Sequence, residues 1–172
     1  MRLIQNIMVY LDGSEVSIDA VRYAVLLARF NRARLFAIYV VDTKALEGLL
    51  KAKIFVESEE LEYEHDLEAN GKRYLKYARD LAGEQGLEIT ELLERGIVNR
   101  EVVKKTRDLG IDLLVIGELK EALSRRDSFY DEAEQIFRRV SCPVLVVKEG
   151  EKVEEIFEEL SISSPDKIGG AD

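Results

Sequence analysis

Short apolar runs alternate with amphipathic segments along most of this chain. Runs that are apolar at consecutive positions, rich in Val and Ile and bounded by turn residues, are typical of strands buried on both faces of a sheet. Such runs occupy residues 3–11, 34–41, 113–116 and 144–147, and a partly alternating run at 87–93 is typical of a sheet edge. Between them, apolar residues recur at helical spacing over 14–31, 57–86 and 99–109, and again in a segment that begins near Ser128. Asn99 is a suitable N-cap for the helix that runs through Leu109. This alternation predicts an α/β fold with an open five-stranded parallel sheet and helices on both of its faces.

Two of the predicted strands end in residues suited to a ligand site. Asp12 and Gly13 close the first strand, Ser14 can cap the helix that follows, and Gly117 closes the strand at 113–116. Ligands of open α/β sheets bind outside the carboxyl ends of the strands, beside helix amino termini. Asp12 has a second interpretation, because aspartate in such a position also closes an Asx-turn without any ligand. The pattern leaves both roles open.

These stretches resemble the universal stress protein family. The first strand with DGSE after it, the second strand ending in VVD, and the stretch from DLLVIG to SCPVLVVK are similar to that family's domain, over residues 1–149. The resemblance implies a Rossmann-like sheet of strand order 3-2-1-4-5, as in the adenine nucleotide alpha hydrolase-like fold. In nucleotide-binding members it further implies adenosine contacts at Asp12 and at the backbone of Val41, with Gly117 as the first glycine of the phosphate motif. These three residues are the candidate cofactor-binding pocket, or its vestige.

The phosphate motif itself is degenerate in this chain. Nucleotide-binding members of the family have G-x2-G-x9-G-[S/T], and the positions after Gly117 fall on Lys120, Tyr130 and Asp131. A phosphate cradle needs glycines, so that backbone N–H groups can approach the phosphate closely at a positively charged helix end. We therefore expect no nucleotide cofactor, with ATP or AMP binding at a degenerate loop as the alternative.

The charged residues around the start of the next predicted helix have opposite effects on phosphate binding. Ser128 is a suitable N-cap, Asp131 follows in a capping-box arrangement, and the first turns carry three acidic residues. Each such charge stabilises the helix dipole by roughly 0.3–1 kcal/mol and repels an incoming phosphate. Lys120, Arg125 and Arg126 would attract one. The sequence leaves open whether this basic trio forms an anion site or a solvated loop.

Composition narrows the class of protein. A net charge of −9 argues against a general surface for nucleic acid or anionic membranes, and no apolar run approaches the roughly 20 residues that span a bilayer. The amino terminus is too soon polar for a signal peptide and is better explained as the first strand. The single cysteine excludes an intramolecular disulfide. We expect a cytoplasmic protein without nucleic-acid or membrane partners.

The sequence offers few residues for catalysis or for metal binding. The one histidine, His65, lies in the charged part of a predicted helix, where a solvated side chain is the simplest expectation. Neither a Ser–His–Asp nor a Cys–His combination can be assembled around it, and no cluster has the spacing of metal ligands. Cys142 begins a buried strand and is expected to be a small core residue. We therefore expect no enzyme activity, no catalytic residue and no metal.

Two features of the carboxyl-terminal part predict association. Residues 150–172 form a second unit, in which 151–160 are an acidic amphipathic helix and the remainder is a polar tail; its apolar stripe needs a partner in its own domain or in a second subunit. The strand at 143–148 lies at one sheet edge in the family's order, where pairing with a second copy would satisfy its free backbone groups. The resemblance also implies dimerisation through this strand. The competing possibility is that 151–160 cover the edge within one chain.

The resulting hypothesis is a stress-response protein of the universal stress protein kind that acts by dimerisation and protein association. The alternative is an ATP- or AMP-binding member with a degenerate loop, which could act as a slow ATPase. A third class is an interaction module whose tail docks another protein.

Overall fold

The computed structural model describes residues 2–52, 57–119 and 131–162. Their elements run in the order β1 Asn6–Leu11, α1 Glu15–Asn31, β2 Arg34–Asp42, α2 Thr43–Lys51, α3 Glu57–Glu84, β3 Ile89–Gly96, α4 Val98–Asp108, β4 Leu113–Gly117, α6 Glu132–Arg139, β5 Val144–Val147 and α7 Gly150–Ile162. The five strands form one parallel sheet in the order β3-β2-β1-β4-β5. The predicted fold class and strand order are confirmed.

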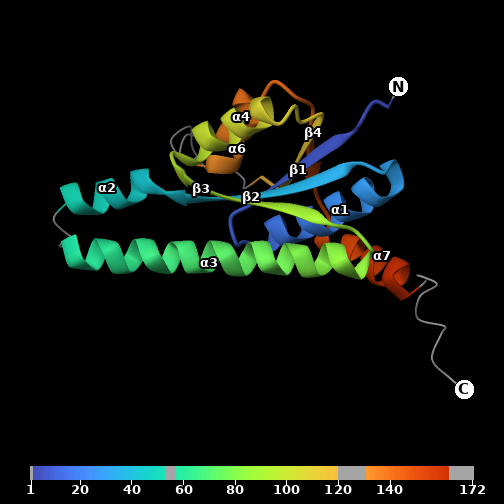
Figure 1. The fold of residues 1–172 in the computed structure, drawn as a ribbon, viewed down its shortest axis with the longest axis horizontal. Helices are drawn as coiled ribbons and strands as arrows, with labels where there is room; N and C mark the ends of the chain where they lie inside the picture. The colour runs from blue at the N-terminus through green and yellow to red at the C-terminus, as the bar shows by residue number, and fades with distance from the viewer. Residues whose placement is uncertain (1, 53–56, 120–130, 163–172) are drawn as a thin grey trace, which may run out of the picture.

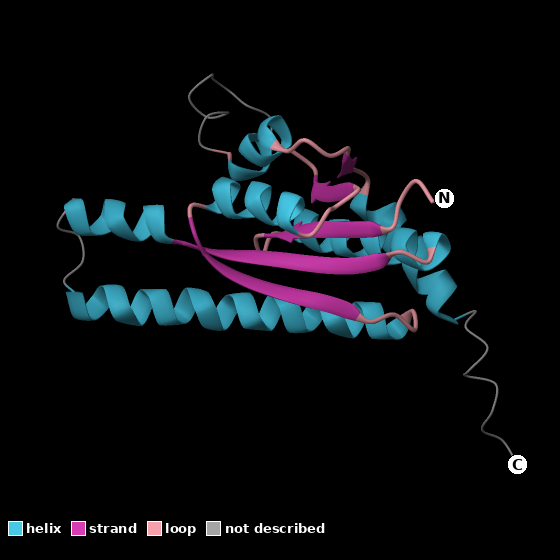
Figure 2. Cartoon of the chain, turned by 45° about the horizontal axis from the view of Figure 1, so that its top comes forward, coloured by secondary structure: helices cyan, strands magenta, loops and turns pink. Residues whose placement is uncertain are grey.

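Both faces of the sheet are buried, as the consecutive apolar positions of the strands predicted. Helices α1, α3 and α7 cover one face and α4 and α6 the other (Figures 1 and 2). In β1, Ile7, Val9 and Leu11 belong to the core under α1 and α3, while Met8 and Tyr10 belong to the core under α4 and α6. Since side chains alternate along a strand, only a strand apolar at every position can serve two cores.

Some predicted boundaries were wrong at strand and helix starts. The first strand begins at Asn6 rather than at residue 3, because the backbone N–H groups of Gln5 and Asn6 both donate to Asp112 Oδ2 at 2.9 Å instead of extending the ladder. Leu3 is 92% exposed. Asp131, not Ser128, is the N-cap of α6, and its Oδ1 accepts from the backbone N–H of Glu134 at 3.2 Å. Ser128 lies outside the described residues.

Asn99 was expected to cap the helix that follows β3, and this prediction was wrong. That helix, α4, begins at Val98, and Ile97 occupies its N-cap without a side-chain hydrogen bond. Asn99 is the second residue of α4 and only 6% exposed, and its side-chain amide contacts α6 instead. Its Nδ2 donates to Glu132 Oε2 at 3.0 Å and its Oδ1 accepts from Arg139 Nη1 at 2.7 Å. The Asn99 side chain, which the sequence pattern predicted as a helix cap, therefore forms a tertiary contact between α4 and α6 instead.

The stretch after β2 is helical and projects from the sheet. Asp42 caps α2, its Oδ1 accepting from the backbone N–H groups of Lys44 and Ala45 at 2.9 and 3.2 Å. The 28-residue helix α3 returns alongside, and its first half extends with α2 past the end of the strands (Figure 1). His65 lies on this part of α3 with an exposed side chain, as predicted.

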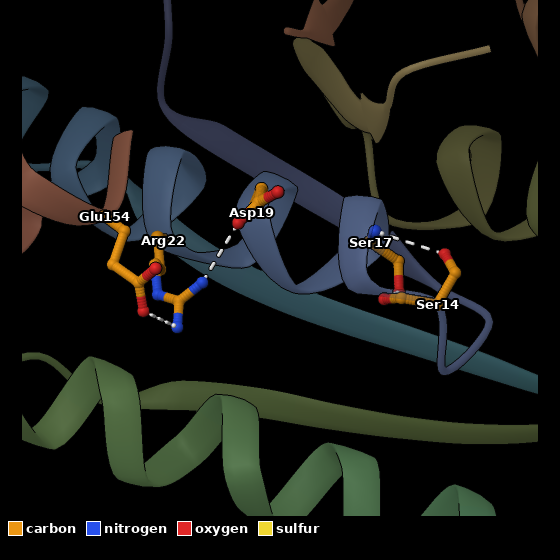
Figure 3. A network of polar contacts seen from close by, with 5 residues as sticks. All are labelled: Ser14, Ser17, Asp19, Arg22 and Glu154. Atoms are coloured by element: carbon orange, nitrogen blue, oxygen red, sulfur yellow. Dashed lines mark hydrogen bonds and ion pairs between the residues drawn. The ribbon is translucent and has the colours of Figure 1, made fainter. Parts of the chain in front are cut away.

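Helix α7 folds back onto its own chain. Val153 and Phe157 are buried in the core under α1 and α3, at 6% and 2% exposure. At the far end of α3, Gln85 Nε2 donates to the Phe157 carbonyl at 3.1 Å. Arg22 of α1 bridges to Glu154 of α7 at 2.8 Å while also pairing with Asp19 at 3.0 Å (Figure 3). The apolar stripe seen in the sequence thus finds its partner within the same chain.

Truncating one residue of this stripe tests its contribution to stability. Phe157→Ala should lower the free energy of unfolding by about 3–5 kcal/mol, because it leaves a cavity in the core. Ile156, its neighbour, is 41% exposed, so Ile156→Ala should change the free energy by no more than about 0.5 kcal/mol. Urea denaturation measures both variants. A Phe157→Ala loss that depends on protein concentration would contradict packing within one chain.

Candidate functional site

The carboxyl edge of the sheet is stepped, because β2 and β3 extend past the end of β1. Strand β1 stops at Leu11, opposite Tyr39 of β2, whereas β2 continues through Val41 to Asp42 and pairs there only with β3. Strand β1 has β2 on one side and β4 on the other, and the direction in which the chain adds strands reverses between β1 and β4. The topological switch point of the sheet therefore lies between β1 and β4. This is the edge at which the sequence placed Asp12, Val41 and Gly117.

Asp12 closes the turn between β1 and α1. Its Oδ1 accepts from the backbone N–H of Ser14 at 2.8 Å, which is an Asx-turn, and also from the Ser14 hydroxyl. Ser14 is the N-cap of α1, with its Oγ accepting from the backbone N–H of Ser17 at 3.3 Å (Figure 3). Asp12 is exposed, so its second carboxylate oxygen is accessible from solvent. The local turn accounts for aspartate here, and the exposed position leaves room for a further contact.

Gly117 is required by packing. A Cβ on this residue would lie 2.4 Å from the Val16 carbonyl oxygen and 3.0 Å from the Ser17 backbone nitrogen, which are fixed atoms of the first turn of α1. Any larger residue would push the helix start away from β4. The glycine that matches the start of the phosphate motif therefore has a structural reason to be there, independent of any phosphate. Asp12 and Gly117 are brought together around the same helix turn.

An aromatic wall beside this turn was not predicted. A Cβ on Gly13, whose φ of +86° suits glycine, would lie 2.5 Å from the Tyr74 ring of α3. The ring of Tyr74 stacks with that of Tyr39 of β2, with centroids 6.2 Å apart, and Arg73 lies 5.6 Å from its centre. The sequence signal was limited to the place of Tyr74 in the apolar stripe of α3, which gave no indication that the ring reaches the turn.

Val41 contributes only its backbone to the carboxyl edge of the sheet. Its side chain is 2% exposed and belongs to the core under α1 and α3. Beyond it, Asp42 is occupied by capping α2. A ligand at this edge would therefore meet the peptide groups of β2 and not the Val41 side chain, as the family resemblance implied.

The electrostatic environment of the edge is acidic. Burial raises the pKa of Tyr10 well above its ordinary value, and the nearby carboxylates of Asp12, Glu132 and Asp131 raise it further. Asp131 caps α6, so the positive end of that helix is already occupied by a carboxylate of the chain itself. A phosphate entering here would meet these charges. Lys120 and Tyr130, the other altered motif positions, lie outside the described residues.

Other candidates for chemistry are sparse in the part of the chain that the structure describes. Within it, no group of three His, Cys, Asp or Glu residues could hold a metal ion, and no helix is long and apolar enough to cross a membrane. Cys142 is half-buried against the core under α4 and α6, and burial raises the pKa of its thiol. Such a thiol is less easily ionised than a free cysteine, which fits the predicted core role.

Comparison with known proteins indicates the family of this chain. The model of the universal stress protein family matches residues 3–148. Universal stress protein MJ0531 of Methanocaldococcus jannaschii is 34% identical over 151 residues, which are 87% of this chain and 85% of that protein. Among solved structures, universal stress protein UspA from Lactobacillus plantarum superposes with a TM-score of 0.67 at 22% identity, covering 86% of this chain and 99% of that one.

A second solved structure, a universal stress protein from Archaeoglobus fulgidus in complex with dAMP, has a TM-score of 0.58 at 17% identity and covers 85% of this chain and 99% of that chain. At these identities the two structures establish a shared fold. The family model and the relative from Methanocaldococcus jannaschii establish more: this chain belongs to the universal stress protein family.

Proposed function

We propose that this universal stress protein acts by dimerisation and association with other proteins, without ATP at its carboxyl edge and without catalysis. The observation that carries the proposal is the start of α6, where Asp131 caps the helix and Glu132 and Glu134 add charge to its first turn. In a phosphate-binding fold, that helix end supplies positive potential and free N–H groups. Here its own carboxylates neutralise the potential, and one of them accepts a helix N–H. Stress response in the cytoplasm is the role that fits such a member of the family.

The alternative function, binding of ATP or AMP, is supported by features that the carboxyl edge of the sheet retains. Asp12 keeps an exposed carboxylate oxygen, the end of β2 offers peptide groups, and Tyr74 supplies an aromatic surface beside the turn. The relative from Archaeoglobus fulgidus that was solved with dAMP has the same fold. A base and ribose are compatible with these features. The acidic start of α6 is unfavourable for the phosphates of a nucleotide.

The proposed dimer interface is the outer edge of β5. The backbone N–H of Leu114 donates to the Pro143 carbonyl at 3.0 Å, so alternate peptide groups of β5 face β4 and those of Val144 and Val146 face outward. Within the described part of the chain, no strand pairs with that outer edge. Helix α7 packs on α1 rather than along β5, which favours the edge as an interface over its being covered by this helix.

The first prediction concerns ATP. Isothermal titration at physiological salt with magnesium should give a dissociation constant weaker than ~10 μM, which corresponds to about −7 kcal/mol. Asp131→Ser keeps a residue able to cap α6 and removes one carboxylate, so it should strengthen any residual ATP binding. Tight binding by the wild-type protein would contradict the proposal in favour of the nucleotide-binding alternative.

The second prediction concerns Asp12. Asp12→Asn should lower the free energy of unfolding by no more than ~1 kcal/mol, because asparagine makes the same Asx-turn. Thermal denaturation measures this, and circular dichroism checks the fold. If Asp12→Asn abolished binding of adenosine or AMP while leaving the stability unchanged, Asp12 would be a ligand-binding residue and not only a turn residue.

The third prediction concerns assembly. Sedimentation equilibrium of the full chain should show a dimer. Val146→Pro removes one outward N–H from β5 and should shift the equilibrium toward monomer, because proline is tolerated on an edge strand but cannot donate to a new ladder. Ser161→Ala on α7, away from the edge, is the control and should leave the dimer intact. A wild-type protein that is monomeric at every concentration tested would contradict the dimer.

A further inference from the structure

A groove along α4, bordered at one point by Arg139 at the end of α6, is basic although the chain as a whole is acidic. The cavity has a volume of about 560 Å³, within the range of about 300–1,000 Å³ that small-molecule sites occupy. It is lined by Asn99, Arg100, Val103, Lys104, Arg107, Asp108 and Arg139. These residues comprise four cations and one carboxylate, a formal charge of +3, on a protein whose net charge is −9. The two helices lie side by side on one face of the sheet (Figure 1).

The cations of this groove are largely free of carboxylate partners. Within the described residues, Arg100, Arg107 and Arg139 form no ion pair, and Lys104 pairs with Asp108 at a long 3.4 Å. By contrast, Arg22, Arg79, Arg95 and Arg138 do pair with a carboxylate of the chain. Unpaired guanidinium groups that converge on one concavity are suited to an anion, because each presents several N–H donors in a fixed fork.

The position of Arg100 is not explained by the stability of α4. Arg107 lies in the last turn of α4, where a cation stabilises the helix dipole. Arg100 lies in the first turn, where the dipole disfavours a cation. The two residues and Lys104 follow at helical spacing along one side of α4, over about 10 Å. A ligand that contacts all three would account for a charge that the helix alone does not favour.

A buried amide holds the fourth cation in place. Asn99 is 6% exposed and lines the groove, with its Oδ1 accepting from Arg139 Nη1 at 2.7 Å. Its Nδ2 donates in turn to Glu132, which fixes the orientation of the amide. Arg139 is therefore oriented before any ligand arrives, and Val103 supplies an apolar wall between the charged groups. Preorganised donors of this kind reduce the entropy that binding must overcome.

From these observations we propose that the groove between α4 and α6 binds a small polyvalent phosphate compound. None of its lining residues is Asp12, Val41 or Gly117, so this site is distinct from the candidate nucleotide pocket. A long nucleic acid is disfavoured, because the basic strip is only about 10 Å long and the rest of the chain carries a formal net charge of −12, that is −9 for the whole chain minus the +3 of the groove. Phosphate is favoured over carboxylate, since a tetrahedral phosphate has more oxygens for the several guanidinium groups that meet here.

A second basic cluster is the main competitor. Arg2, Arg32 and Arg34, with Gln5, line a cavity of about 380 Å³ at the amino ends of the strands. Two of these side chains already have acceptors: Arg34 Nε donates to Asn6 Oδ1 at 2.9 Å and Arg2 to the Arg32 carbonyl at 3.3 Å. That cavity also lacks an apolar side chain in its lining. It serves as an internal comparison for the experiment.

The test is calorimetric titration of the full chain with inorganic tripolyphosphate in 50 mM salt. We expect a dissociation constant below ~100 μM, weakened at least ~10-fold by the double variant Arg100→Ala/Arg107→Ala, because charge-assisted bonds to two guanidinium groups are lost. Asp108→Asn should tighten binding by ~2-fold or more, since it removes the one opposing charge. Raising the salt to 200 mM should weaken binding.

The chain provides a matched control for the lysine. Lys104 and Lys76 are both exposed and both pair with an aspartate four residues on, at 3.4 and 3.0 Å, but Lys76 lies on α3 outside the groove. Lys104→Ala should weaken tripolyphosphate binding by ~3-fold, whereas Lys76→Ala should leave it within ~1.5-fold of wild type. Arg32→Ala should also leave it unchanged.

Four outcomes would overturn the proposal. The first is undetectable binding of tripolyphosphate, and the second is equal weakening by Lys104→Ala and Lys76→Ala, which would mean a diffuse charge effect. The third is weaker tripolyphosphate binding by Arg32→Ala while the groove variants bind as the wild type does, which would place the site at the amino ends of the strands. The fourth is tighter binding of citrate, or of single-stranded DNA with affinity that rises with its length, which would assign the groove to carboxylates or to nucleic acid.

Discussion

The contact between the first turn of α1 and the end of β4 constrains the rest of the carboxyl edge. Backbone atoms of Val16 and Ser17 lie so close to Gly117 that no Cβ fits between them. This contact fixes where α1 begins, and Asp12 and Ser14 then supply the turn and the cap that such a beginning needs. Tyr74 closes over the turn from α3. One close approach thus sets the position of the helix start, and the Asx-turn, the cap and the Tyr74 ring lie around that position.

Because of this constraint, the presence of Gly117 does not imply phosphate binding, although both belong to the motif of the nucleotide-binding family members. Gly117 matches the first glycine of a phosphate motif, yet packing against α1 requires it whether or not a phosphate binds. Of the later motif positions, only Asp131 lies within the described residues, and its carboxylate caps α6. A packing requirement therefore preserves one glycine, while the chemistry of phosphate binding depends on the other positions. For this reason the presence of Gly117 is weak evidence for a nucleotide, and the identity of residue 131 is stronger evidence.

The sequence predicted what depends on local pattern and missed what depends on tertiary contact. Strands buried on both faces leave continuous apolar runs, so β2, β4 and β5 could be predicted to within one residue, and the strand order followed from the family resemblance. The Asx-turn at Asp12 follows from residues adjacent in the chain. Asn99 was misassigned because its partners, Glu132 and Arg139, are more than 30 residues away. Tyr74 was missed for the same reason: a residue in an apolar helix stripe gives no sign of which turn its ring covers.

The acidity of the chain as a whole does not determine the charge of each of its surfaces. Salt screens exposed charges beyond about 8–10 Å at physiological ionic strength. The exposed glutamates of α7 lie on the opposite side of the sheet from α4 and α6, across two layers of packing of about 10 Å each. They are therefore too distant to neutralise Arg100, Arg107 and Arg139, whereas Asp108 in the groove and Glu132, which shares Asn99 with Arg139, lie close enough to offset part of this charge. An anion close to the groove consequently experiences the local cations rather than the net charge, and an acidic protein can present one basic site.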